Sequence, residues 1–360
     1  MSRLTSYVDL AEAFQRLDPI RVSAVAREAE KVLWYSAELA KMHLSISSSG
    51  NNEALMGFLR KAYMDKWGFP PLSIADLPLI RAYVEKRLSS EPVPGLGKFL
   101  EMIKPKPGGS PWSYTVLSSI LKMSLSYLLG GSLKNYLIMV RGDKGLGKTT
   151  YTFNSIFQTF MDIGFPRDTA YEFAHKLTFW KLDTWLVAMD ELNQERKTVL
   201  CTLNDDFGVH ASKYWTFDSK TRKSFPRISQ ILQTLKDLVS VLVVTAPELE
   251  VLASFLRDAV NYHVFFEQVS LGAGQGNMVL IKWTRRKTNE KTRVRTVEVV
   301  EYLDLLPIYV RLPQEFWDEM TTIRAEDRAE RIRGFMQEMY GDGEEGEEEE
   351  QEAIGGGLFA

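Results

Sequence analysis

Residues 135–150 read NYLIMVRGDKGLGKTT, an apolar run that ends in the pattern G-x-x-x-x-G-K-T. This Walker A pattern is typical of a phosphate-binding loop, whose backbone N–H groups can face an anion because glycine has no side chain in the way. It predicts a short buried strand before the loop and a helix from Thr149 to about residue 162 after it, with the helix N-terminus aimed at the phosphates. The sequence therefore predicts an α/β fold organised around a bound nucleoside triphosphate.

The positions of the loop have distinct expected roles. Lys148 would reach the β- and γ-phosphates of ATP and support catalysis, and the Thr149 hydroxyl would hold Mg²⁺. ATP and Mg²⁺ are thus the expected cofactors. The predicted nucleotide-binding residues are Gly142, Asp143, Lys144, Gly145, Leu146, Gly147, Lys148, Thr149 and Thr150.

Composition predicts a globular chain with a cytoplasmic location. No apolar run approaches the roughly 18 residues of a membrane helix, and the first residues lack the core of a signal peptide. One cysteine, Cys201, excludes an intrachain disulfide, and the four histidines show no zinc-ligand spacing. Residues 341–360 hold eight acidic residues and no lysine or arginine, so the rest of the chain is mildly basic, with 44 basic and 39 acidic residues.

Helical periodicity and proline-rich breaks divide the chain into segments. Helices are expected across residues 5–44, with a break at Asp18-Pro19, and again at 53–67 and about 75–88. Prolines and glycines between residues 91 and 111 place a boundary near residue 104. The predicted parts are a helical N-terminal domain (1–104), a P-loop ATPase core (105–270), a basic β-hairpin with C-terminal helices (271–340) and a disordered acidic tail (341–360).

Short apolar runs alternate with helical segments after the phosphate loop. The strands expected there are 177–180, 198–203, 239–244 and 263–267, and the later helices are 183–197, 226–238 and 249–262. Strands that alternate with helices predict a parallel sheet covered by helices on both faces.

Two acidic pairs compete for the second motif that an ATPase needs, a carboxylate at the end of a strand near Mg²⁺. Asp190-Glu191 comes only about 40 residues after Lys148, which is too short for the intervening elements, and residues 183–197 read better as an amphipathic helix. Asp205-Asp206 ends the strand 198–203 and is preferred. Asp205 would hold Mg²⁺, and Asp206 would polarise the attacking water.

With these elements in place, residues from about 110 to 270 resemble the P-loop ATPases of the AAA+ and RecA-like division, which insert an extra strand before the acidic motif. The matching residues are the phosphate loop, Asp205-Asp206 and Thr245 at the end of the fourth strand. The resemblance implies that Thr245 senses the γ-phosphate. It also implies that Arg257 is an arginine finger for a neighbouring subunit, and hence a homo-oligomer.

Residues 205–210, taken with 245–247, are also similar to uncharacterised ATPases of archaeal plasmids and viruses. The chain departs from the AAA+ pattern in two places. Asp206 stands where that division usually has glutamate, and a hairpin follows the fifth strand in place of a helical lid.

The predicted hairpin at 278–300 is strongly basic. Its cations are Lys282, Arg285, Arg286, Lys287, Lys291, Arg293 and Arg295. A basic β-ribbon can follow the phosphate backbone of DNA, but the same charges protect an edge hairpin from aggregation, and the sequence leaves both open. The acidic tail either recruits a protein partner, as the tails of single-stranded-DNA-binding proteins do, or serves solubility.

These features together predict a Mg²⁺-dependent ATPase whose hydrolysis drives work on DNA, such as helicase loading, replication initiation or translocation, as an oligomer. The alternative is a nucleotide-gated switch or scaffold, such as a transcription or partition regulator, with slow hydrolysis. Stimulation of turnover by DNA separates the two.

Overall fold

The computed structural model describes most of the chain, and contacts group it into two compact units, Met1–Arg311 and Leu312–Ala360. The described residues are 6–68, 71, 110–205, 235–246, 259–272, 276–288, 296–308, 312 and 314–340. The predicted helix at 75–88, most of those at 226–238 and 249–262, the boundary near residue 104 and the acidic tail lie outside these residues.

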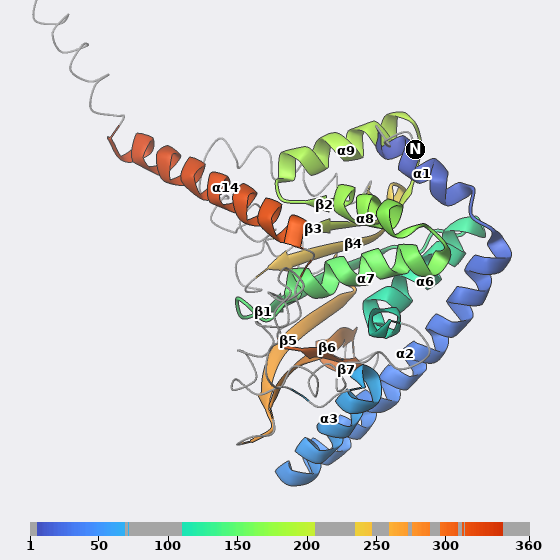
Figure 1. Cartoon of the computed structure of the whole chain (residues 1–360), viewed down its shortest axis with the longest axis vertical. Helices are drawn as coiled ribbons and strands as arrows, with labels where there is room; N and C mark the ends of the chain where they lie inside the picture. The colour runs from blue at the N-terminus through green and yellow to red at the C-terminus, as the bar shows by residue number, and fades with distance from the viewer. Residues whose placement is uncertain are drawn as a thin grey trace, which may run out of the picture. The chain divides into compact units, whose positions relative to one another are not determined.

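A seven-stranded sheet forms the centre of the first unit, in the order β2-β3-β4-β1-β5-β6-β7 (Figure 1). Strands β1 to β5 pair in parallel, and β6 and β7 are added antiparallel to β5. The strands are β1 (Tyr136–Gly142), β2 (Thr178–Phe179), β3 (Val199–Asn204), β4 (Val239–Ala246), β5 (Tyr262–Ser270), β6 (Asn277–Thr288) and β7 (Thr296–Pro307). The predicted α/β fold with a parallel sheet is therefore confirmed.

The helices of the first unit whose bounds are described precede β4 in sequence. These helices are α1 (Tyr7–Gln15), α2 (Pro19–Ser48), α3 (Asn52–Trp67), α6 (Val116–Leu129), α7 (Lys148–Ile163), α8 (Arg167–Lys176) and α9 (Leu182–Gln194), with short 3₁₀ turns η2 (Pro111–Tyr114) and η4 (Leu235–Asp237). The expected break after α1 is confirmed: Asp18 caps α2 by accepting from the Ile20 N–H, and Pro19 occupies the first helical position. Within the described residues, no helix has the length and apolar character needed to cross a bilayer.

The N-terminal helices share a core with the rest of the first unit. Phe14 of α1 is almost completely buried and packs against the rings of Phe160, Phe165 and Phe173, with centroid separations of 5.5 to 6.2 Å. Helix α2 packs along α6 and reaches β7. The division at residues 104, 270 and 340 stays a prediction, while the described part of 1–104 is packed on the sheet layer that holds the phosphate loop.

Helix α6 fixes the position of α7, the helix that follows the phosphate loop. Its interleaved serines and threonines bond across the helix pair: Thr115 to Ser155 at 2.9 Å, and Thr159 to Ser118 at 3.1 Å. These small polar residues let the two helices approach closely while every buried hydroxyl named here keeps a partner. Lys122 of α6, expected to lie in a packed helix, pairs with Asp162 of α7 at 2.6 Å.

The hairpin β6–β7 is longer than the sequence predicted, with twelve residues in each strand. The second unit contains α14 (Gln314–Tyr340), in agreement with the expected C-terminal helices.

Candidate phosphate-loop site

The loop between β1 and α7 depends on glycine at its two ends. Gly142 has φ 140°, and a Cβ there would lie 2.7 Å from the Phe266 carbonyl oxygen on β5. Gly147 has φ 84° and begins α7 as its N-cap residue. Both positions exclude ordinary side chains, because positive φ strains them and Gly142 also has no space. The chain can therefore enter and leave the loop only with these glycines.

Lys148 points back into the loop. Its Nζ donates to the carbonyl oxygens of Gly142, at 2.6 Å, and Asp143, at 3.0 Å. The ammonium group is thus held at the mouth of the loop, where a phosphate would be bound. Among the other predicted nucleotide-binding residues, Asp143, Lys144 and Gly145 are exposed, whereas Leu146 and Thr150 are buried.

Asp205 brings the loop together with the ends of two strands. Its Oδ1 atom accepts hydrogen bonds from Thr149 Oγ1 at 2.7 Å and from Thr245 Oγ1 at 2.8 Å. The carboxylate follows β3 directly and is 2% exposed. The structure thus assembles the first residues of α7, the end of β3 and the end of β4 at one edge of the sheet, as expected when parallel strands end together.

Asp190, the competing acidic residue, lies elsewhere. It is on α9, exposed to solvent, and accepts from Gln194 one turn further along the same helix. The predicted helix at 183–197 and strand at 198–203 are confirmed as α9 and β3. Asp206 and Arg257 lie outside the described residues, so their roles stay predictions.

The residues at this edge fit a Mg²⁺ ion. Thr149 Oγ1 and the Asp205 carboxylate supply hard oxygen ligands of the kind that Mg²⁺ prefers. No group of three or more His, Cys, Asp or Glu side chains that could hold a metal occurs among the residues described. A site with two protein oxygens leaves the remaining positions for phosphate oxygens and water, which is the usual arrangement for Mg²⁺.

A second polar cluster beside the loop was not identified from the sequence. The Arg141 guanidinium, one residue before Gly142, lies 3.4 Å from the centroid of the Phe265 ring and 3.7 Å from Glu298 of β7. His263 of β5 is completely buried, and neither ring nitrogen has a hydrogen-bond partner in the part of the chain that the structure describes. Burial lowers the pKa of His263 to about 4. Only the strand register could have placed these residues together.

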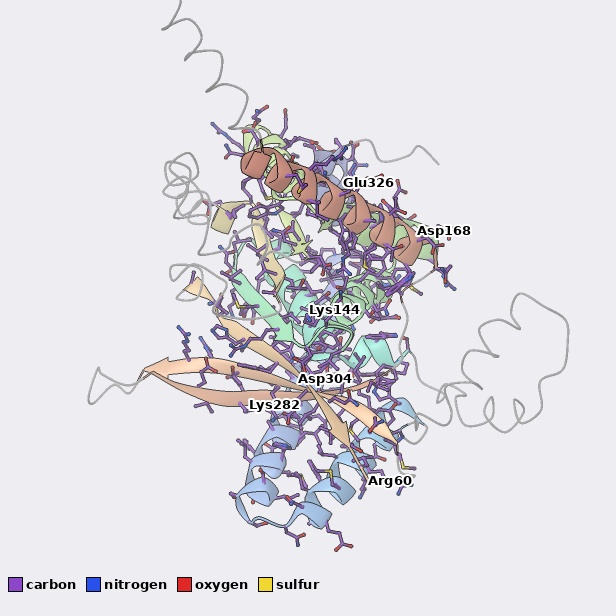
Figure 2. The ribbon with its side chains drawn as sticks, turned by 90° about the vertical axis from the view of Figure 1, so that its left-hand side faces the viewer. Arg60, Lys144, Asp168, Lys282, Asp304 and Glu326 are labelled. Carbon is purple, nitrogen blue, oxygen red and sulfur yellow. The ribbon has the colours of Figure 1, made fainter. Side chains whose placement is uncertain are left out.

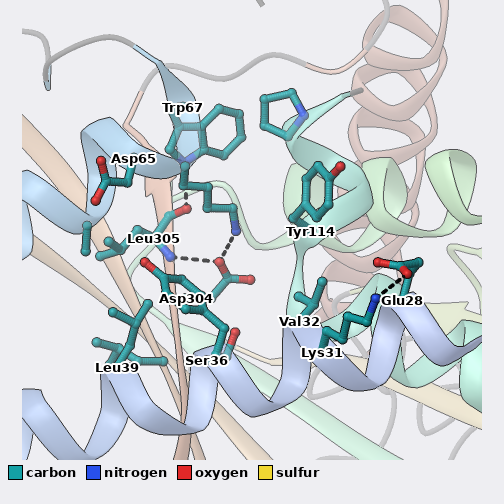
Figure 3. A pocket seen from close by; sticks show the side chains of 15 residues that line it. Glu28, Lys31, Val32, Ser36, Leu39, Asp65, Trp67, Tyr114, Asp304 and Leu305 are labelled. Carbon is teal, nitrogen blue, oxygen red and sulfur yellow. Dashed lines mark hydrogen bonds and ion pairs between the residues drawn. The ribbon is translucent and has the colours of Figure 1, made fainter. Parts of the chain in front are cut away.

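A separate pocket of about 430 Å³ lies between α2, α3, η2 and β7 (Figure 3). Its wall is mostly apolar and includes Leu39, Trp67 and Tyr114, and Asp304 lies at its base. No residue of the phosphate loop lines it, so it is distinct from the nucleotide site.

Comparisons with known proteins place the chain beside P-loop ATPases. No protein-family model matches it. It is 26% identical over 120 residues to "Uncharacterized protein B-251" of Sulfolobus spindle-shape virus 1. That match covers 33% of this chain and 46% of the relative, so the chain spans less than half of the relative's length.

Three solved structures are similar at low identity. The flagellar accessory protein FlaH from Methanocaldococcus jannaschii is 10% identical, over 49% of this chain and 92% of that one, with a TM-score of 0.25. A KaiC-like protein from Pyrococcus horikoshii is 12% identical, over 49% and 93%, with a TM-score of 0.26. The ATPase domain of a helicase is 13% identical, over 64% and 98%, with a TM-score of 0.27. All three are RecA-like P-loop ATPases, the group that the sequence resembles.

Proposed function

We propose that this P-loop chain hydrolyses ATP with Mg²⁺ and couples hydrolysis to work on DNA, such as helicase loading, replication initiation or translocation, as an oligomer. One observation carries the ATPase part: a single oxygen of Asp205 accepts from both Thr149 and Thr245, next to the lysine of a phosphate loop. This joins a metal-binding carboxylate, a metal-binding hydroxyl and a hydroxyl at the end of the neighbouring strand.

Each side chain has a role that follows from its position. Lys148 exchanges its two carbonyl partners for oxygens of the β- and γ-phosphates, a stronger charge-assisted contact. Thr149 and Asp205 hold Mg²⁺, which supplies positive charge beside the transferring phosphoryl group. Thr245 contacts Asp205 from β4 and can also reach the γ-phosphate, so it reports on the presence of that group. Asp206 is proposed to orient the attacking water.

The DNA part is supported by the cations of the hairpin β6–β7. Lys282, labelled in Figure 2, pairs with Glu267 of β5, and Arg286 lies beside Glu298 of β7. Arg285 is exposed and lies 5.9 Å from the centroid of the Tyr262 ring. Side chains of this kind can exchange a carboxylate or ring contact for a DNA phosphate, with release of counterions. The acidic tail is proposed to recruit a protein partner.

The experiment that tests the proposal measures ATP hydrolysis with and without single-stranded and double-stranded DNA. The wild type should hydrolyse ATP faster when DNA is added. Lys148→Ala should lose ATP binding, because the phosphate charge then has no cation in the loop helix to meet it. A matched control is Lys134→Ala, which removes a lysine before β1 that contacts the Tyr127 ring.

The outcomes separate the alternatives. Unchanged ATP affinity in Lys148→Ala would contradict the nucleotide site itself. Slow hydrolysis that DNA does not stimulate, together with an ATP-dependent change in oligomeric state, would replace the motor by a nucleotide-gated switch.

A further inference from the structure

Glu298 of β7 lies between two arginines that come from different strands. Its Oε2 atom is 3.7 Å from Nη2 of Arg141 on β1, and its Oε1 atom is 3.7 Å from Nε of Arg286 on β6. Each carboxylate oxygen faces one guanidinium at the same distance. We call Arg141, Glu298 and Arg286 the Glu298 bridge.

One end of the bridge is fixed to the phosphate loop. Arg141 directly precedes Gly142, and its guanidinium lies against the ring of Phe265, its register partner on β5. Gly142 is pressed against the next residue, Phe266, so closely that no Cβ fits between them. The side chain of Arg141 is only 14% exposed. Its charge therefore stays close to the start of the loop in whichever state the hairpin adopts.

The other end of the bridge lies on the basic hairpin. Arg286 is the register partner of Glu298 in the β6–β7 pair, and its side chain is 31% exposed. It can therefore reach a phosphate of a nucleic acid without leaving its strand. His263, which shares this face of the sheet, is buried and its lowered pKa keeps it neutral near pH 7, so it does not compete for the carboxylate.

We propose that Glu298 is a positioning residue that couples nucleic acid on the hairpin to ATP in the phosphate loop, by dividing its negative charge between Arg286 and Arg141. This inference rests on the proposed function for its second ligand, and on the geometry alone for the coupling. When a phosphodiester takes Arg286, Glu298 pairs with Arg141 alone.

The sign of the coupling follows from the charges. Arg141 attracts ATP most strongly when its charge is not compensated. A Glu298 released by Arg286 compensates Arg141 fully, so nucleic acid weakens ATP binding. By reciprocity ATP weakens nucleic-acid binding by the same factor. The chain would then hold nucleic acid tightly when ATP has left the loop.

A double-mutant cycle on ATP affinity tests the bridge without any nucleic acid. Glu298→Gln should raise ATP affinity about two- to fivefold, the range of partly exposed ion pairs, because Arg141 loses its counter-charge. Arg286→Gln should lower ATP affinity by a similar factor, because Glu298 then belongs to Arg141 alone. The double variant should match Glu298→Gln, since Arg286 acts only through Glu298.

The cycle separates the bridge from simpler explanations. If Arg286→Gln lowers ATP affinity equally in both backgrounds, Arg286 acts as a distant charge and the bridge is refuted. If Glu298→Gln lowers ATP affinity, Glu298 has only a structural role. Glu267→Gln is the matched control, because it breaks the Lys282 pair of the same sheet without touching Arg141, and it should leave ATP affinity unchanged.

A second arm adds a single-stranded oligonucleotide to the same ATP titrations. ATP affinity of the wild type should fall about two- to fivefold, and that of Glu298→Gln should change less. If the oligonucleotide does not bind, the proposed DNA function fails while the cycle still decides the bridge. If it binds and weakens ATP equally in both proteins, the bridge does not carry the coupling.

Discussion

Oδ1 of Asp205 accepts two hydroxyl hydrogen bonds, from Thr149 and Thr245, and this makes Asp205 the most informative single carboxylate to change. Asp205→Asn keeps the shape of the side chain and removes its charge. Hydrolysis should fall by about two orders of magnitude or more, as is typical when one preorganised electrostatic contact is lost from an active site. Steady-state ATPase assays at saturating Mg²⁺ measure this loss.

Asp190→Asn is the control for this change. Asp190 has the competing sequence pattern but lies exposed on α9, where it contacts only Gln194 among the hydrogen bonds described. Its replacement should leave the rate within a factor of about two, because exposed substitutions away from a site have small effects. An inactive Asp190→Asn protein would mean that the acidic motif was assigned to the wrong strand.

His263 gives the protein a specific pH dependence. Its pKa is lowered from 6.5 to about 4, chiefly by burial and by the nearby charges of Arg141 and Arg286, while Glu298 acts in the opposite direction. The unfolded chain therefore binds a proton between pH 6.5 and 4 that the folded chain does not. The free energy of unfolding should fall across this range by about 3 kcal/mol on account of His263, with no further loss from it below about pH 4.

His263→Gln should remove that contribution, because glutamine does not titrate. Urea unfolding at several pH values between about 7 and 4 measures the difference in slope between the two proteins. Parallel pH profiles for wild type and variant would show that His263 titrates normally, whatever the overall stability of the variant.

Among the elements, β7 joins several helices through the buried carboxylate of Asp304 (Figure 3). It pairs with Lys66 of α3, accepts from Val116 N–H at the start of α6 at 3.0 Å, and accepts from the Tyr151 hydroxyl of α7 at 2.9 Å. Asp304→Asn should destabilise the protein by roughly 3–5 kcal/mol, because Lys66 is left buried without a counter-charge. Urea unfolding measures the change.

The double variant Lys66→Met/Asp304→Asn tests the stated cause. It should be more stable than Asp304→Asn alone, since it no longer buries an uncompensated ammonium group. Lys41→Met, which breaks an exposed pair with Glu38 on α2, should change stability by less than about 1 kcal/mol. A double variant as unstable as the single one would assign the loss to the hydrogen bonds of Asp304 instead.

Local sequence patterns predicted the elements around the nucleotide site well. The glycine pattern located β1 and α7, and helical periodicity through Trp185 and Met189 separated α9 from β3, which in turn identified Asp205. Helix α8 was not predicted, because its ten residues between Pro166 and Leu177 are largely polar and give a weak apolar stripe.

Contacts between distant strands were beyond the reach of the sequence. Glu298 read as one acid in a basic hairpin, and its place between Arg141 and Arg286 follows from the pairing of β6 with β7, which includes a register shift between Trp283 and Thr284. A shift of one residue would have turned Glu298 to the other face of the sheet. Asp304 was missed for the same reason, since its partners Lys66, Val116 and Tyr151 come from three separate helices.

At the scale of the whole molecule, the proposed oligomer predicts an active site shared between subunits. Arg257, which lies outside the described residues, would supply positive charge to the γ-phosphate of a neighbour. Such an arginine is worth roughly 10³-fold or more in rate. Arg257→Ala subunits and Lys148→Ala subunits should therefore each be inactive alone and should regain hydrolysis when mixed, because one partner supplies a loop and the other an arginine.

ATPase assays on the separate and mixed proteins measure this complementation. The matched mixture replaces the Lys148→Ala protein by the double variant Lys148→Ala/Arg257→Ala, which can supply neither group and should restore nothing. Full activity of Arg257→Ala by itself would exclude a finger at this position.

The lysine that donates to its own loop has a consequence for the time course of binding. Before a phosphate can take Lys148, the ammonium group must leave the Gly142 and Asp143 carbonyl oxygens, which lie 2.6 and 3.0 Å away. Nucleotide capture then consists of a diffusive encounter and a slower first-order exchange of partners. The observed association rate should rise with ATP concentration and level off at the rate of that exchange, so that the empty loop, rather than diffusion, limits how fast the chain can be recharged.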